Sequence, residues 1–182
     1  MAILDGKPIV LIVVITNCQT RAHSDFEAID AIAQKNLGAD YYNVHSTEEI
    51  DYMQDLHYAH GSTLVSEDDV QCTFVAKEDG VCLGFVCVTQ EGPELYHLTK
   101  IYVTAPRQNN GLGSALFDRV VSYIKERHHN EQVILELNVS SHNKSANFYH
   151  RVGMHKVREN IVSLDNNFTF VQDVYSMTID CP

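Results

Sequence analysis

The stretch Lys100-Ile101-Tyr102-Val103-Thr104-Ala105-Pro106-Arg107-Gln108-Asn109-Asn110-Gly111-Leu112-Gly113 passes from a strand pattern into a helix pattern. Its β-branched and aromatic start is typical of a strand. Gly111 to His128 then carries apolar residues at helical spacing. Two glycines let the backbone approach an anion closely, and the first N–H groups of a helix have no internal partner. The pattern fits a phosphate-binding loop, although a plain strand-to-helix turn would also explain it.

Two common phosphate-binding motifs are excluded at this loop. A P-loop needs Lys followed by Ser or Thr after its last glycine, and Ser114-Ala115 follows Gly113 here. A dinucleotide fingerprint needs a third glycine, which is absent.

The rest of the chain predicts a mixed α/β sheet with helices on both faces, in the order β-α-α-β-β-β-α-β-α-β-β. Expected strands and helices alternate along the sequence, with a helix opening at Ser24-Asp25-Phe26-Glu27 and another at Ser46. The remaining predicted elements are strands 8–15, 71–76, 81–89, 94–103 and 132–139, a short helix 143–151, and a closing hairpin of strands 157–164 and 168–178. Residues 25–60 are either an ordinary amphipathic helix pair or one wall of an acceptor pocket.

Length and charge limit the function. The 182 residues suit one domain, 1–182, and the formal net charge is 13 − 24 = −11. A chain this acidic is a poor candidate for non-specific nucleic-acid binding, so we expect no nucleic-acid partner. The charge suits a cationic substrate or serves solubility alone.

The cysteines and the apolar runs predict a cytoplasmic protein. Five scattered cysteines without a CxxC pair are unlike a disulfide framework. The apolar run Ile9 to Ile15 is much shorter than the roughly 20 residues that span a bilayer, so we expect no membrane association. The histidines lack partners at ligand spacing, so we expect no metal.

Two motifs together resemble the GNAT superfamily of N-acetyltransferases. Gln108-x-x-Gly111-x-Gly113 is similar to the family's Gln/Arg-x-x-Gly-x-Gly/Ala signature. Asn143-Lys144-Ser145-Ala146-Asn147-Phe148-Tyr149-His150-Arg151-Val152-Gly153-Met154 resembles its second motif, with Met154 in place of a final Phe. The resemblance covers about residues 72–178 and leaves 1–71 as a variable, acceptor-side region. It implies a central, mostly antiparallel twisted sheet of six to seven strands.

The resemblance implies acetyl-CoA as cosubstrate and a set of residues that bind it. The pantetheine arm would pair with the backbone of the strand before the loop, and the pyrophosphate would bind the loop. The implied residues are Ile101, Tyr102, Val103, Gln108, Asn109, Asn110, Gly111, Leu112, Gly113, Ser114, Asn143, Ala146 and Tyr149. Asn143 would bind pantetheine, cap the following helix, or do both. Asn109 and Asn110 replace the usual Gly and cation, with Arg107 as a candidate to compensate.

The same resemblance implies direct acetyl transfer to an amine. Tyr149 stands at the family's general-acid position, and phenols are protonated at neutral pH. The alternative is that Phe148-Tyr149 is only the apolar face of a short helix. His97 stands where many members carry a glutamate base, and simple alternation would place it on the face of Ile101 and Val103. The alternatives are a structural histidine at this position and Glu94 as a weaker candidate base.

Three functions remain open from the sequence. The first is acetylation of a small, cationic amine, since the strand Leu98-x-x-Ile101-Tyr102-Val103 resembles that of bacterial polyamine and small-amine acetyltransferases. The second is acetylation of a protein or peptide amine. The third is a non-catalytic CoA-binding sensor. A homodimer through the C-terminal strands is compatible with each.

Overall fold

A computed structural model describes residues 3–4, 7–8, 27–33, 35, 71–141, 143, 145–163 and 169–182. Strands β1 (Ile3–Leu4) and β2 (Lys7–Pro8) pair antiparallel in a sheet of their own. Residues 27–33 and 35 are helical, as the capping box at Ser24 predicts. Most of the predicted strand 8–15 and the helix expected from Ser46 lie outside the described residues.

Six strands form the main sheet, in the order β3-β4-β5-β6-β8-β7. All neighbours pair antiparallel except β5 and β6, which are parallel. The mixed, mostly antiparallel sheet predicted from the sequence is therefore confirmed. The strands are β3 (Gln71–Glu78), β4 (Val81–Gly92), β5 (Leu95–Val103), β6 (Glu131–Ser140), β7 (His155–Ser163) and β8 (Thr169–Cys181).

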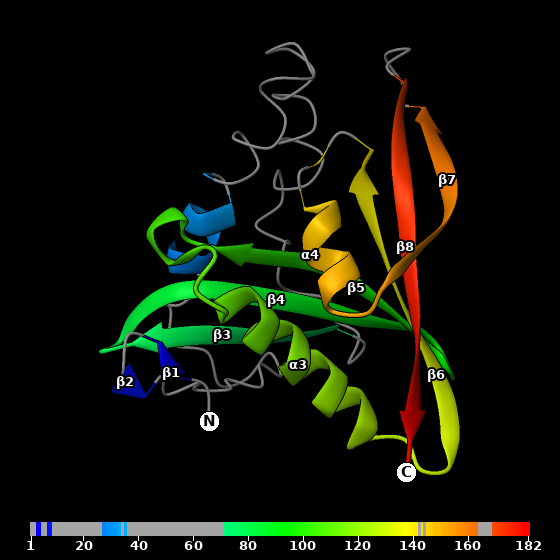
Figure 1. Cartoon of the computed structure of the whole chain (residues 1–182), viewed down its shortest axis with the longest axis horizontal. Helices are drawn as coiled ribbons and strands as arrows, with labels where there is room; N and C mark the ends of the chain where they lie inside the picture. The colour runs from blue at the N-terminus through cyan, green and yellow to red at the C-terminus, as the bar shows by residue number, and fades with distance from the viewer. Residues whose placement is uncertain are drawn as a thin grey trace.

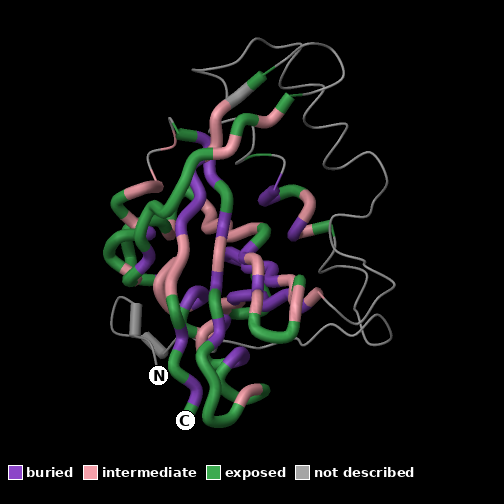
Figure 2. Tube along the Cα trace, turned by 90° about the vertical axis from the view of Figure 1, so that its right-hand side faces the viewer, coloured by how far each residue is buried: buried purple, intermediate pink, exposed green. Residues whose placement is uncertain are grey.

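The three helical segments that follow β5 lie near its end and across one face of the sheet. The 3-10 helix η1 (Ala105–Arg107) links β5 to the loop before α3 (Leu112–Lys125). Helix α3 contacts β3, β4, β5 and β8, and α4 (Ala146–Arg151) lies beside it (Figure 1). Buried residues lie along most strands of the sheet, whereas the outer strand β7 is mostly exposed (Figure 2).

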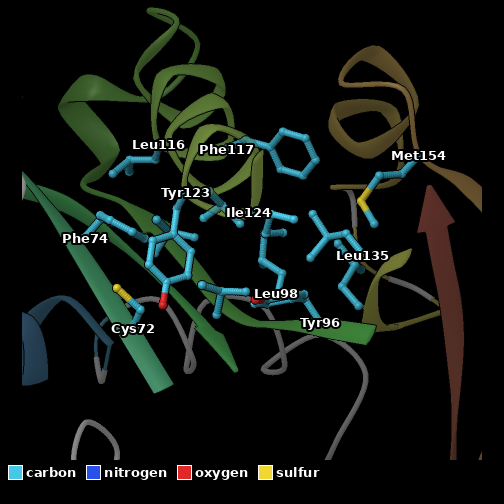
Figure 3. Close-up of a cluster of buried hydrophobic side chains, with 14 of the residues drawn as sticks. Cys72, Phe74, Tyr96, Leu98, Leu116, Phe117, Tyr123, Ile124, Leu135 and Met154 are labelled. Atoms are coloured by element: carbon cyan, nitrogen blue, oxygen red, sulfur yellow. The ribbon is translucent and has the colours of Figure 1, made fainter. Parts of the chain in front are cut away.

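The main core lies between α3, α4 and this face of the sheet. Phe74, Leu98, Leu116, Phe117 and Ile124 interlock there with almost no exposed surface (Figure 3). Met154, which replaces the expected phenylalanine, is fully buried in the same cluster and fills that position with a flexible apolar side chain. These apolar contacts hold α3 against the sheet and bring the apolar side of α4 into the same core.

A smaller core on the opposite face joins the sheet to helix 27–33. Ile29, Ile32 and Ala33 pack there against the sheet residues Val75, Phe85 and Cys87. The expectation of helices on both faces is thus confirmed. Burial lowers the pKa of the nearby Lys100 amine, and Cys87 and Asp30 oppose that shift.

Gly84 is required where β4, β5 and α3 meet. A Cβ at this position would lie 2.6 Å from the Tyr102 carbonyl oxygen and 3.3 Å from Leu116 Cδ1. Because the closest atom is backbone, Gly84→Ala must move β5 and should lower the free energy of unfolding by about 1–3 kcal/mol. Gly92→Ala is the matched control on the same strand, since its Cβ would meet only Leu95 Cβ at 3.6 Å. Urea unfolding of both variants checks this, and equal midpoints would contradict it.

Candidate active site

Strands β5 and β6 pair over only part of their length and then separate. They pair only from Leu95–His97 to Ile134–Glu136, after which the two strands leave in different directions (Figure 1). The six remaining residues of β5, 98–103, have no ladder partner on β6. His97 and Glu136 therefore stand at the apex of a V-shaped opening in the sheet.

A β-bulge at Thr99 corrects the predicted alternation along β5. The register on β4 shifts between Cys87↔Lys100 and Val88↔Leu98, so Thr99 is an extra residue. Its hydroxyl donates to the Cys87 carbonyl at 3.3 Å. Ile101 and Val103 consequently pack on the α3 face, against the same cluster as Leu98.

His97 and Tyr102 lie on the other face. Tyr102 packs into the smaller core with a ring-to-ring distance of 5.6 Å to Phe85. His97 pairs in register with Thr89 of β4. Thr89 follows Val88, whose side chain lies in the α3-side core, so Thr89 and His97 face the opposite side of the sheet. The prediction that His97 shares a face with Ile101 and Val103 is wrong, because one bulged residue reverses the alternation.

The end of β5 presents backbone groups toward the opening. The Thr104 N–H donates to the Leu83 carbonyl of β4 at 2.9 Å. Since N–H groups alternate in direction along a strand, those of Ile101 and Val103 point away from β4 and toward the gap. The Gln108 side-chain amide donates to the Val103 carbonyl at 3.0 Å and holds the loop against the strand.

The loop geometry suits a phosphate. Asn109 and Gly111 both adopt left-handed backbone angles, with φ of 60° and 81°. Gly111 is the N-cap of α3 without a side-chain capping bond, and the first turn carries no acidic residue. The helix hydrogen bonds begin with Ala115 N–H to Gly111 O at 3.0 Å, so Leu112, Gly113 and Ser114 offer amides at the positive end of the helix dipole.

Side chains at the loop play different parts. Leu112 is fully buried in the main core, so its side chain is not available to a ligand. The Arg107 guanidinium forms an ion pair with Glu78 at the β3–β4 turn. Its charge is thus already offset by a carboxylate, and the idea that Arg107 replaces the missing loop cation gains no support. This leaves the backbone amides as the candidate donors of the loop to an anion.

Helix α4 places Tyr149 on the α3 side of the opening. The Asn143 carboxamide oxygen accepts from the Ser145 N–H at 2.8 Å and forms a turn before the helix. The capping alternative for Asn143 is not observed, because Ser145 is the N-cap residue and no side chain caps it. A Cβ added at Gly113 would lie 3.3 Å from Phe148 Cε2, so α4 packs closely against the loop at the start of α3. The Tyr149 ring is buried against Tyr175, with 5.6 Å between ring centroids. Ala146 begins the same helix, half-buried.

His97 has charged neighbours that the sequence does not single out. Its Nδ1 lies 3.9 Å from Glu91, at the end of β4. Glu136, its register partner on β6, accepts two hydrogen bonds from Arg158 at 2.9 and 2.7 Å. The one available sequence signal was the polar position of Glu136 inside an alternating strand. Glu94, the other candidate base, is exposed in the turn before β5, where its carbonyl accepts from the Ile134 N–H.

The comparisons with known proteins agree with this geometry. The profile of the acetyltransferase (GNAT) family matches residues 32–154. The chain belongs to the GNAT family. The matched range includes the bulged strand, the phosphate loop and α4, and GNAT enzymes transfer acetyl from acetyl-CoA. A search of curated proteins finds no match.

Solved structures share the GNAT fold at low sequence identity. PaiA N-acetyltransferase from Thermoplasma acidophilum, in complex with coenzyme A, is 16% identical with a TM-score of 0.66, covering 87% of this chain and 95% of its own. The ribosomal-protein-S18-alanine N-acetyltransferase from Escherichia coli is 15% identical with a TM-score of 0.57, covering 90% and 94%. Nourseothricin acetyltransferase is 26% identical with a TM-score of 0.54, covering 62% and 67%. Their names span protein and small-molecule acceptors, so the shared fold leaves the acceptor open.

This GNAT chain is therefore an acetyl-CoA-dependent acetyltransferase. Within the described ranges, no three His, Cys, Asp or Glu side chains are grouped as a metal site would require. No described helix is both long and apolar enough to cross a membrane.

Proposed function

We propose that this enzyme acetylates the primary amine of a small, cationic acceptor by direct attack within a ternary complex. The observation that carries the proposal is the V-shaped opening between β5 and β6. His97 stands at its apex on one face, and Tyr149 lies in the core on the other. A reaction centre in this opening would have a proton acceptor and a proton donor on opposite sides.

The cosubstrate supplies the acetyl thioester, and the chain's own groups bind and orient it. Amides of residues 112–114 would hold the pyrophosphate, and Ile101 and Val103 would pair with the pantetheine arm as an added strand does. The Val103 N–H would stabilise developing negative charge on the thioester oxygen. Tyr102, whose ring faces the smaller core, would border the acceptor side instead.

Protons move in two steps in this scheme. His97 accepts a proton from the attacking amine, directly or through water, as the new C–N bond forms. The Tyr149 hydroxyl donates its proton to the CoA thiolate as the C–S bond breaks. Formation of an amide and a free thiol balances the reaction without a covalent enzyme species.

Charge supports a cationic acceptor. The formal net charge of −11 raises the local concentration of positive ligands. Near the opening, Glu91 lies beside His97 and is about half exposed, so it is available to an ammonium group. A second amine on the acceptor could bind such a carboxylate while the first reacts.

A thiol-release assay tests the proposal. The protein is incubated with acetyl-CoA and polyamines, simple monoamines, or peptides with a free N-terminus or lysine, and free CoA is followed. We expect the fastest release with polyamines and none with fully N-acetylated polyamine as the matched control. Release with peptides alone would favour a protein acceptor. Tight CoA binding without release for any amine would favour a non-catalytic sensor.

A further inference from the structure

A row of polar side chains crosses the sheet on the face opposite α3. The strand register aligns Thr89, His97, Glu136, Ser176 and His155 on five neighbouring strands, β4, β5, β6, β8 and β7. The neighbouring residues on these strands point to the α3 face and are buried and apolar, as Leu98 and Leu135 show. This polar row passes through the apex of the opening, at His97 and Glu136.

Glu136 is the charged centre of the polar row. Its side chain is 17% exposed, and both carboxylate oxygens accept from Arg158, at 2.9 and 2.7 Å. Hydrogen bonding to this guanidinium lowers the pKa of the Glu136 carboxyl, burial opposes the shift, and the charges of Arg158 and His97 add to it. Glu136 is therefore a fixed carboxylate one strand away from His97.

Arg158 reaches Glu136 across an intervening strand. It pairs in register with Val174 on β8, yet its guanidinium binds a carboxylate on β6, the strand beyond. A bulge between Lys156 and Arg158 resets the alternation of β7 at this point. Holding an exposed arginine in this two-bond geometry costs side-chain entropy. The free energy gained by an exposed ion pair rarely exceeds that cost.

We propose that Glu136 is a positioning residue for His97, and that Arg158 tunes how strongly its carboxylate favours the protonated imidazole. This rests on the proposed role of His97 as base. A histidine that accepts a proton gains a positive charge, which a fixed carboxylate at the adjacent register position stabilises. Arg158 offsets part of the negative charge of that carboxylate. Among the described residues, Glu91 lies 3.9 Å from His97 Nδ1, and His155 stands in the same polar row three strands away.

Removing the negative charge of Glu136 and removing the positive charge of Arg158 should shift the pH dependence of the reaction in opposite directions. Glu136→Gln should move the acid limb of the kcat/KM pH profile to lower pH by about half a unit, and Arg158→Gln should move it to higher pH by a similar amount. The double variant should return the limb toward its original position. Lys156→Gln is the matched control, because Lys156 is on the same strand but pairs with Glu159 and Asp173 instead. It should leave the limb in place.

A second readout does not depend on turnover. NMR titration measures the pH midpoint of the His97 imidazole resonance, which the His97→Gln variant assigns. This midpoint should move to lower pH in Glu136→Gln and to higher pH in Arg158→Gln. Opposite shifts support the inference, even if no acceptor is ever found. Midpoints that stay fixed, or move the same way in both variants, overturn it. If they shift as expected while His97→Gln turns over normally, the base assignment fails and the coupling stands.

Discussion

Gly113→Glu should abolish acetyl-CoA binding, with a loss of affinity of about 100-fold or more. A carboxylate would enter the first turn of α3, where the structure has no acidic residue and the helix dipole favours an anion. The new side chain would also start 3.3 Å from Phe148 Cε2 and push against α4. The CoA-induced rise in melting temperature, which reports binding to the folded state, should disappear.

Gly113→Ala separates size from charge at this position. Its Cβ meets the Phe148 ring edge, which needs to give by only a few tenths of an ångström. We expect this variant to keep most of the ligand-induced rise in melting temperature. An undiminished rise in Gly113→Glu, with the unliganded protein folded, would refute the assignment of the phosphate loop.

Tyr149→Phe should lower kcat by about 100-fold and leave acetyl-CoA affinity nearly unchanged. The substitution removes the hydroxyl that is proposed to protonate the leaving thiolate. It keeps the ring that packs against Tyr175 and Phe148, so the fold of α4 should persist. Steady-state kinetics with the best acceptor from the thiol-release assay, together with CoA titration, measures both quantities.

Tyr123→Phe is the control for the loss of a buried phenol. Tyr123 lies in the same core on α3, where burial raises the pKa of its hydroxyl to about 12, next to Cys72 (Figure 3). Its removal should affect stability more than turnover. A kcat that stays at the original value in Tyr149→Phe would take Tyr149 out of the acid role.

Local patterns were sufficient for most of the described elements. The period-two runs and turn residues placed β3 to β8, and the helical spacing after Gly111 placed α3, each within three residues of the observed bounds. The short helix α4 was expected from Asn143, but its helical residues begin at Ala146, because Asn143 forms the turn before it. Such boundaries depend on capping geometry, which sequence patterns specify only loosely.

The sequence pattern predicts the wrong side-chain directions along β5. Alternation placed His97 with Ile101 and Val103, whereas the bulge at Thr99 puts them on opposite faces. A bulge inserts one residue without changing composition or hydrophobic pattern enough to be noticed. In the proposed function this matters, because His97 and the β5 backbone that would bind the cosubstrate then serve different sides of the same opening.

The sequence by itself determined the family and its acetyl-CoA chemistry, and it located the candidate phosphate loop, because these depend on residues close together in the chain. Gly111 and Gly113 at the start of a helix, with Asn143 to Met154 later, carry that information locally. The tertiary structure alone decided where β5 and β6 separate, that Arg107 is paired with Glu78, and that Arg158 binds Glu136 beside His97. These are pairings between distant segments, and their geometry is set by sheet register and packing, which no local pattern encodes.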